Sequence, residues 1–541
     1  MARDLQSDLA MLREVLKLAQ ARDLQRAGAM ARAALAEGFE HPLLLNVVAT
    51  TLEQEGRFAE SAELLERAVE LAPQDVPARN ALALCLQRLE RPAAALFHVD
   101  ILLQHHPELG FAHANKGNAL IALGFLGRAR ASHLRALELD PANISAKASL
   151  ASIASHRGNH DEARSWAQQV LAVVPQYPDA VIALAAAELA AGNLARAESL
   201  LRNLVTDQRV AELDAARAGG LLGDVLDAGG RYPEAWAAYT ACNTALLRIF
   251  NQLQSGTLTA YANQLTTTIS NTVDRYRIAA ADPPVYPGAD VTEHVFLLSF
   301  PRSGTTLLEV VLDGHPRVAS LDEHELLTEA AREFTSDPGN FDALTQASEA
   351  DLERLRRAYW DRVREGEVDV AGKVFVDKYP MNTLKLPLIA RLFPNAKILF
   401  VCRDPREVVL ACFRRRFRMN VATYELLTLP GAAALYDVTM RFGELMRPVF
   451  GANWREVRYE TLVGDFAGQT RALCEFLGLE WIEGLDQFAQ RARERERSTP
   501  STAQLARGLD RSGAAHWQHY RAQLEPVWPT LQTWAERFGY T

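Results

Sequence analysis

Prolines and glycines recur every 34 residues in the first half of this sequence, and this period limits what that half can fold into. The recurring residues are Pro73, Pro107, Pro141 and Pro175 together with Gly56, Gly124, Gly158 and Gly192, with Glu90 in the place of one glycine. Between them run alanine-rich segments with apolar residues at helical spacing, such as GRFAESAELLERAVELAP (56–73). Proline cannot continue a helix and glycine supplies a turn, so each period predicts two helices joined by a short turn.

A 34-residue unit of two helices resembles the tetratricopeptide repeat. In the third unit, Gly117, Ala129, Ala136 and Pro141 stand where that repeat has a glycine, a small residue, an alanine and a proline. The resemblance implies an all-α solenoid whose concave surface could dock a protein or peptide acceptor. A spacer, or a device that assembles a homodimer, is an alternative that the residues leave open.

The pattern changes towards the middle of the chain, which predicts three segments. Residues 1–245 are predicted to be helical repeats, and residues 246–288 a helical connector that ends in the proline-rich linker DPPVYPG (282–288). In residues 289–541, short apolar runs such as HVFLLSF (294–300) and AKILFVC (396–402) alternate with longer amphipathic segments. Such alternation is typical of an α/β domain with a buried parallel sheet.

Charge and composition exclude several classes of function. The net charge is −9 and the pI is about 5.9, so no overall basic field favours nucleic acid or an anionic membrane. No stretch reaches the roughly 18 apolar residues that span a bilayer, and acids interrupt the apolar residues at the start. The five cysteines include no C-x-x-C pair. We therefore expect a cytoplasmic protein with reduced thiols, no nucleic-acid partner, no membrane insertion and no metal site.

A glycine-containing loop follows the first apolar run directly, in PRSGTTLLEVVLDGHP (301–316). A strand, a glycine turn and a helix N-terminus together direct backbone N–H groups at an anion. The loop is not a Walker A motif, because Thr305 stands where that motif has its lysine. The predicted anion-binding residues are Arg302, Ser303, Gly304, Thr305 and Thr306.

The loop resembles the 5′-phosphosulfate loop of sulfotransferases that use PAPS, and three later segments extend the resemblance. They are ILFVCRDPREVVLACF (398–413) with Arg403, VRYETLV (457–463) with Tyr459, and RSTPSTAQLARGLDRSGAAHWQHY (497–520) with Ser501 and Thr502. Together with the repeats, they resemble bacterial fusions whose catalytic half is similar to tyrosylprotein sulfotransferases. The resemblance implies a P-loop-like α/β domain with a central parallel sheet, PAPS as cosubstrate, PAP as product and no metal. It also places these four residues in the nucleotide site.

The same resemblance assigns catalytic roles. Glu323, eight residues after His315, matches the family's catalytic base. Arg302 would stabilise the transferring group, and Lys378 in VDKYPMNTLKLP (376–387) would contact the leaving oxygen. Three neighbours of Glu323 offer related acid–base chemistry and remain alternatives as the base: Asp322, His324 and Glu325.

Two features of the nucleotide segment stand apart from the family pattern. Ala411 stands where the family usually has a serine, eight residues after Arg403. A lost hydrogen bond to a charged group is worth roughly 1.5–3 kcal/mol, so weaker PAPS binding is expected. The basic run RRRFR (414–418) has two interpretations, a solvated helix face or a local anion patch.

The sequence thus predicts a PAPS-dependent sulfotransferase that transfers a sulfuryl group to a hydroxyl of a protein or peptide, such as a tyrosine, positioned by the repeats. One alternative is a carbohydrate or small-metabolite acceptor. Another is a repeat scaffold whose sulfotransferase domain is weakly active or inactive. All nucleotide motifs lie after Pro284, so a protein that begins there is expected to retain PAP binding.

Overall fold

The structure is a computed structural model of the chain and describes residues 5–254, 256–276, 290–366, 368–494 and 515–540. The chain forms two compact units. The first comprises Met1–Ala154 and Asp161–Ala180, and the second comprises Ser155–His160 and Val181–Thr541. The second unit therefore combines the predicted catalytic segment with helices from the predicted repeats and connector.

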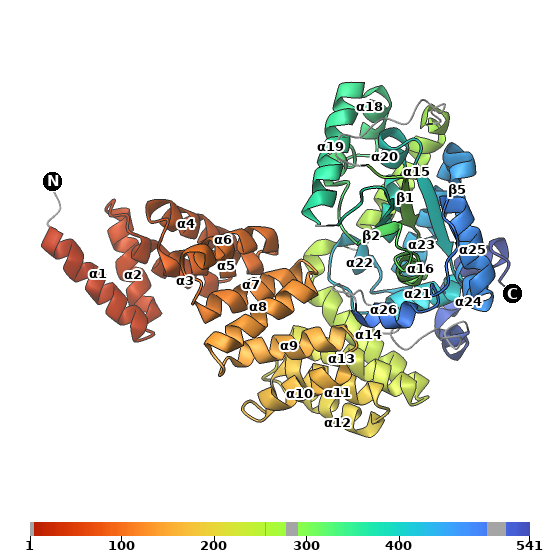
Figure 1. Cartoon of the computed structure of the whole chain (residues 1–541). Helices are drawn as coiled ribbons and strands as arrows, with labels where there is room; N and C mark the ends of the chain where they lie inside the picture. The colour runs from red at the N-terminus through yellow and green to blue at the C-terminus, as the bar shows by residue number, and fades with distance from the viewer. Residues whose placement is uncertain (1–4, 255, 277–289, 367, 495–514, 541) are drawn as a thin grey trace. The chain divides into compact units, whose positions relative to one another are not determined.

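Helices α1 to α10 lie wholly or mostly in the first unit and follow one another as antiparallel pairs (Figure 1). Their bounds are α1 (Leu5–Gln20), α2 (Leu24–Ala36), α3 (Pro42–Gln54), α4 (Phe58–Leu71), α5 (Val76–Arg88), α6 (Pro92–His105), α7 (Gly110–Ala122), α8 (Leu126–Leu139), α9 (Ile144–His156) and α10 (His160–Leu171). Small residues let the helices approach closely. A Cβ on Gly117 of α7 would lie 2.4 Å from Nε2 of His133 in α8. Ala129 and Ala136 are wholly buried. The predicted all-α solenoid is confirmed.

The 34-residue period reappears as a series of left-handed turn residues. The backbone angle φ is positive at six positions, each 34 residues after the last: Arg22, Gly56, Glu90, Gly124, Gly158 and Gly192. Glycine adopts this conformation readily, whereas a side chain costs roughly 1 kcal/mol or more. Glu90, with φ of 55°, keeps the glycine conformation, and Arg22 extends the series one step towards the N-terminus.

The last pair of repeat helices departs from this period. Helix α13 has 17 residues, whereas α3, α5, α7, α9 and α11 have 13 each. The next left-handed glycine, Gly230, follows Gly192 by 38 residues instead of 34. Four extra residues correspond to about one helical turn. The helices of this region are α11 (Pro178–Ala190), α12 (Leu194–Thr206), α13 (Glu212–Ala228), α14 (Tyr232–Ile249), η1 (Asn251–Leu253), α15 (Thr257–Ser270) and η2 (Val273–Tyr276).

The second unit contains a parallel sheet of five strands in the order β2-β3-β1-β4-β5. The strands are β1 (Glu293–Leu298), β2 (Val318–Asp322), β3 (Val374–Lys378), β4 (Lys397–Cys402) and β5 (Trp454–Arg458). The predicted runs 294–300 and 396–402 coincide with the neighbouring strands β1 and β4. Since all strands are parallel, their carboxyl ends share one edge, where α/β folds bind ligands. The predicted α/β domain with a central parallel sheet is confirmed.

The remaining helices, drawn from green to blue in Figure 1, complete the second unit. They are α16 (Thr305–Leu312), α17 (Thr328–Phe334), α18 (Asn340–Gln346), α19 (Glu349–Glu365), η3 (Pro380–Lys385), α20 (Leu386–Leu392), α21 (Pro405–Arg414), α22 (Val421–Glu425), α23 (Leu429–Phe450), η4 (Gly451–Asn453), α24 (Tyr459–Gly464), α25 (Phe466–Leu477), α26 (Phe488–Glu494), η6 (His516–Tyr520), α28 (Arg521–Leu524), η7 (Glu525–Val527) and α29 (Trp528–Arg537). Val295 and Leu297 of β1 share a core with residues of α16 and α25. His294 and Phe296, on the opposite face, contact Tyr359 of α19. Helices therefore cover both faces of the sheet.

The five cysteines are separate from one another. All five are buried and none forms a disulfide in the structure. Within the described ranges, no helix is both long and apolar enough to cross a membrane. The described side chains also include no cluster of three or more histidines, cysteines or acids arranged for a metal ion.

Candidate active site

The predicted anion loop joins the end of β1 to the start of α16. Arg302 and Gly304 both have positive φ, 69° and 103°, which turns the chain sharply before the helix. Ser303, Thr305 and Thr306 are buried. A Cβ on Gly304 would lie 2.4 Å from Cδ2 of Tyr459, so the tyrosine ring requires a glycine there. The loop therefore has the strand–turn–helix form that suits an anion.

Two predicted nucleotide residues from later segments meet this loop. Arg403, one residue beyond β4, donates a hydrogen bond from Nη1 to the carbonyl oxygen of Arg302 over 3.1 Å. Its guanidinium carbon lies 4.6 Å from the ring centroid of Tyr459. Cys412 donates its thiol to the carbonyl of Pro301 at 3.4 Å. The structure thus brings two later segments, 398–413 and 457–463, together around the loop.

A third arginine joins Arg302 and Arg403. Burial and the positive charge of Arg302 lower the pKa of Arg415 to about 9. Burial and the charge of Arg403 likewise lower the pKa of Arg302. Like charges are held close together only where an anion can offset them or where other contacts compensate. The basic run 414–418 marked this region in the sequence, but only the structure singles out Arg415.

Glu323 and Lys378 form an ion pair at the carboxyl ends of β2 and β3. The Nζ of Lys378 lies 2.9 Å from Oε1 of Glu323 and 3.6 Å from Oε2 of Glu309. Lys378 and Glu309 are wholly buried, whereas 44% of the Glu323 side chain is exposed. Lys378 therefore lies behind Glu323. Glu309 was missed from the sequence, although a lone acid in the apolar run TTLLEVVL was a signal.

The backbone is strained at two predicted catalytic residues. Among the described residues from 290 onwards, Arg302 and Glu323 are the only residues other than glycine with positive φ. The φ of Glu323 is 48°, and its backbone N–H donates to the carbonyl oxygen of Lys378 over 2.8 Å. Strain of this kind costs on the order of 1–3 kcal/mol and is concentrated at functional sites. It singles out the same two residues as the sequence.

The alternatives to Glu323 have different surroundings. Lys385 donates from Nζ to Oε2 of Glu325 over 2.8 Å. Burial alone would raise the pKa of Glu325, but the charge of Lys385 and hydrogen bonds from Lys385 and Tyr379 lower it. Glu325 thus has two side-chain partners, Lys385 and Tyr379, that compete with an acceptor hydroxyl for its oxygens. His324 is half-buried beside them, and the side chain of Asp322 lies outside the described part of the chain.

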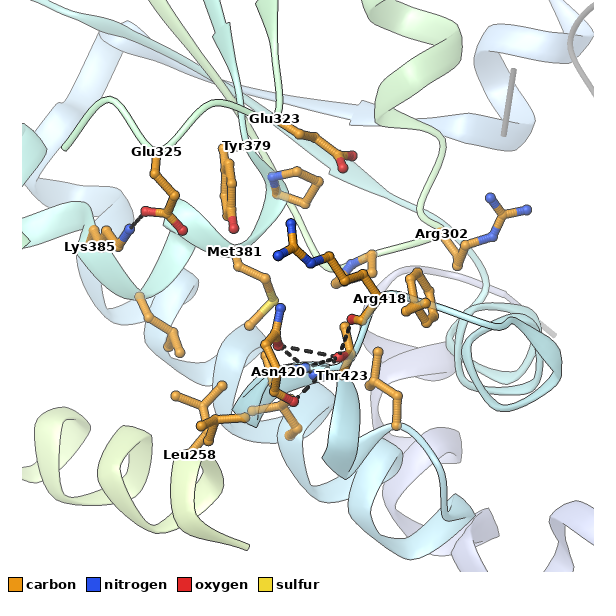
Figure 2. A pocket seen from close by; sticks show the side chains of 18 of the residues that line it. Leu258, Arg302, Glu323, Glu325, Tyr379, Met381, Lys385, Arg418, Asn420 and Thr423 are labelled. Atoms are coloured by element: carbon orange, nitrogen blue, oxygen red, sulfur yellow. Dashed lines mark hydrogen bonds and ion pairs between the residues drawn. The ribbon is translucent and has the colours of Figure 1, made fainter. Parts of the chain in front are cut away.

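A pocket of about 750 Å³ opens beside the loop and Glu323 (Figure 2). Figure 2 shows Arg418 extending into it, with Glu323 on one side and Asn420 and Thr423 on the other. Much of the wall is apolar and comes from α15, η3, α22 and α23, including Leu258, Met381, Leu384, Val421, Leu426 and Leu435. The connector helix α15 therefore forms part of the pocket that Glu323 faces.

The basic run 414–418 is divided between different partners. Arg414 pairs with Asp227 at 2.7 Å, and Arg416 pairs with Asp224 at 2.5 Å. Arg418 lines the pocket. Arg414 and Arg416 are thus paired with aspartates, whereas Arg418 reaches the pocket.

Residues 294–483 match the model of the sulfotransferase family. The second half of the chain contains a sulfotransferase-family domain. Tetratricopeptide-repeat models match residues 12–76, 47–99, 115–181 and 157–219. The sulfotransferase domain therefore follows a repeat region, as predicted.

Relatives of this chain include several sulfotransferases. An uncharacterised protein of Aquifex aeolicus is 27% identical over 247 residues, which cover 44% of this chain and 32% of that protein. Protein-tyrosine sulfotransferase A of Caenorhabditis elegans is 25% identical over 201 residues, which cover 35% of this chain and 50% of that protein. The chain thus spans between a third and a half of these relatives. The solved sulfotransferase domain from the curacin biosynthetic pathway is 23% identical, with a TM-score of 0.34, over 47% of this chain and 99% of that domain.

The described part of the sulfotransferase domain contains most of the predicted site. The loop 302–306, Arg403 and Tyr459 lie together, and Glu323 and Lys378 form a pair beside them. Ala411 is half-buried on α21. Ser501 and Thr502 lie outside the described residues.

Proposed function

We propose that this protein is a PAPS-dependent sulfotransferase that transfers a sulfuryl group to a hydroxyl of a protein or peptide acceptor, with tyrosine as the preferred residue. The observation that carries the proposal is the Glu323–Lys378 pair at 2.9 Å, with Glu323 lining the same pocket as the anion loop. Sulfuryl transfer needs both a base for the acceptor and positive charge near the leaving phosphate. Scaffolding alone requires neither.

The positions of the side chains support the role proposed for each. Glu323 accepts the proton that the acceptor hydroxyl loses as its oxygen bonds to sulfur. The bond between sulfur and the phosphate oxygen breaks at the same time, and PAP leaves. Lys378 and Arg302 stabilise the charge on that oxygen. Arg403, Arg415 and the amides of the loop hold the phosphates, a role supported by the concentration of positive charge there.

The pocket supports an acceptor hydroxyl on an aromatic or apolar group. Its walls include Leu258, Leu384 and Leu435, which suit a ring more than a sugar. Arg418 and Lys385 are placed to meet acidic groups near the hydroxyl. The names of relatives such as protein-tyrosine sulfotransferase A favour tyrosine. A small apolar alcohol or phenol is the second candidate, because the same apolar walls would bind it.

The proposal is tested by ligand binding and by labelling. PAP should raise the melting temperature in the absence of magnesium, because a ligand that binds only the folded state stabilises it. Sulfur-labelled PAPS and a host-cell extract should then yield a labelled polypeptide. Stabilisation by ATP with magnesium but not by saturating PAP would contradict PAPS binding. Label found only in small molecules would favour the second candidate.

A further inference from the structure

The added turn of α13 carries an acidic residue towards the sulfotransferase domain. Asp227 lies in this last turn and Asp224 lies just before it. Oδ2 of Asp227 accepts from Nη2 of Arg414 over 2.7 Å, and Oδ2 of Asp224 accepts from Nη2 of Arg416 over 2.5 Å. The side chains of the two aspartates are only 10% and 25% exposed, respectively. The matched repeats end at residue 219, before this turn.

The surface of α13 is shaped to receive these arginines. A Cβ on Gly220 would lie 2.3 Å from Cδ of Arg416, so the arginine packs directly on the helix at this glycine. Tyr239 of α14 donates its hydroxyl to Oδ1 of Asp224 over 3.0 Å and so orients the carboxylate. Arg416 is therefore held by both packing and charge.

Helix α14 contacts Phe413, the residue that precedes Arg414. The ring of Trp236 stacks on Phe413 with centroids 4.6 Å apart and planes at 21°. Asn243, itself buried, donates from Nδ2 to the carbonyl oxygen of Phe413 over 2.9 Å. The end of α21 is thus attached to both helices of the last pair.

These attachments determine the direction of Arg415. Its backbone is extended, with φ of −93° and ψ of 136°. In extended chain, successive side chains point to opposite sides. Because Arg414 and Arg416 both reach α13, the side chain of Arg415 is directed away from that helix. The charge of Arg415 interacts with that of Arg302 and also with that of Asp224, so it lies between the loop and α13.

We infer that the α13–α14 pair contributes to the nucleotide site. Asp224 and Asp227 are positioning residues that direct Arg415 towards the anion loop. The inference rests on the proposed function, because the anion is taken to be the phosphate of PAP or PAPS. Asp227 also accepts hydrogen bonds from His516 and Tyr520, so the same residue holds the C-terminal segment. The last repeat pair therefore contacts two segments whose sequences resemble nucleotide-binding segments of sulfotransferases.

The test is a double-mutant cycle in the full chain, read as PAP affinity by calorimetry. The variant Asp224→Asn/Asp227→Asn should bind PAP about tenfold more weakly, since hydrogen bonds between charged groups are lost. In an Arg415→Ala background, the same two changes should weaken PAP binding by less than about twofold, because the aspartates act through Arg415. Asp214→Asn is the matched control, since Asp214 also lies on α13 but pairs with Arg217 at 3.1 Å.

A second variant covers the case in which the aspartate variants do not fold. Gly220→Ala leaves both carboxylates in place and favours the helix, but its methyl group would displace Arg416. It should weaken PAP binding while the melting temperature is kept or raised. Losses that simply add to that of Arg415→Ala, or unchanged PAP affinity in both variants, would overturn the inference. Absence of PAP binding by the unaltered protein would instead refute the proposed function.

Discussion

The helix pairs of the first unit and the last pair, α13–α14, share one architecture but differ in what their charged residues do. In the first unit, Arg57 pairs with Glu60 and Arg67 with Glu40, and all four side chains are about half exposed. Exposed pairs contribute roughly 0–1 kcal/mol each. In the last pair, Asp224 and Asp227 are largely buried against arginines of the sulfotransferase domain. One added helical turn thus accompanies buried ion pairs between a repeat pair and the sulfotransferase domain.

This difference changes where the catalytic part of the chain begins. The sequence motifs alone suggest that it begins near Pro284. The contacts of Asp224, Asp227, Trp236 and Asn243 indicate that the nucleotide site needs residues at least from α13 onwards.

The largest expected effect comes from removing the last pair. A protein that begins at residue 290 should lose measurable PAP binding or fail to fold, because Arg414, Arg416 and Phe413 lose their partners. A protein that begins at Pro178 should bind PAP within about threefold of the full chain, since it keeps α11 to α15. Calorimetry after a circular-dichroism check of folding measures both. Equal PAP affinity of the two truncated proteins would show that the last pair contributes no more to PAP binding than the other repeats do.

The next effect tests which carboxylate of the second unit acts as the base. Glu323→Gln should lower kcat by about 10²–10⁴-fold and leave PAP affinity unchanged, because the carboxylate acts on the acceptor. Glu325→Gln is the matched control in the same pocket and should affect kcat far less, because Lys385 and Tyr379 both bond the carboxylate of Glu325. Steady-state kinetics with labelled PAPS measures both variants. A larger loss in Glu325→Gln would assign the base to that residue.

A smaller effect concerns stability. It comes from the buried carboxyl group of Asp377 in the second unit, in contrast to the exposed ion pairs of the first unit. Tyr359 donates to Oδ2 of Asp377 over 2.9 Å, and burial raises the pKa of Asp377 to about 7. The folded-state pKa is therefore above the ordinary value of 3.8, so the stability that Asp377 contributes is fully present below pH 3.8 and is lost as the pH rises through 7. Asp377→Asn should gain stability relative to the unaltered protein between pH 4 and 8, by up to roughly 4 kcal/mol.

The measurement is the urea midpoint of both proteins across this pH range. Burial lowers the pKa of His294 to about 3, so its own contribution is lost as the pH falls from 6.5 towards 3. His294 bonds Tyr359, the partner of Asp377, so the two titrations are coupled, and the difference is read between pH 6.5 and 8, where His294 stays neutral. A difference in midpoint that does not change with pH would show that Asp377 does not titrate in this way.

The smallest effect lies within the first unit. Glu90 occupies a glycine position with φ of 55°, so Glu90→Gly should stabilise the repeats by about 0.5 kcal/mol, after the added entropy of the unfolded chain is subtracted. Gly124→Ala, at the equivalent turn with φ of 83°, should destabilise them by about 1 kcal/mol. Thermal unfolding of the full chain measures both. Changes of the same sign would mean that the turns are not equivalent, which would weaken the idea of interchangeable repeats.

Local features of the molecule could be read from the sequence because each depends on neighbouring residues. The 34-residue period predicted the helix pairs, and its turn glycines do have positive φ. The run 294–306 predicted a strand, a turn and a helix, since a buried strand followed by a glycine turn has few other conformations. The break in the period before Gly230 was also visible in the sequence, but it does not reveal what the added turn contacts.

Only the tertiary structure decided which distant residues meet. Lys378 and Glu323 are 55 residues apart and pair because β2 and β3 are neighbours in the sheet. Asp227 and Arg414 are 187 residues apart and meet because α13 and α21 belong to one compact unit. Conformation along the chain is set by backbone sterics and helical spacing, which act over a few residues. Distant charges can pair only after the helices or strands that carry them are placed. That placement depends on strand order and core packing, and each single residue contributes little to either.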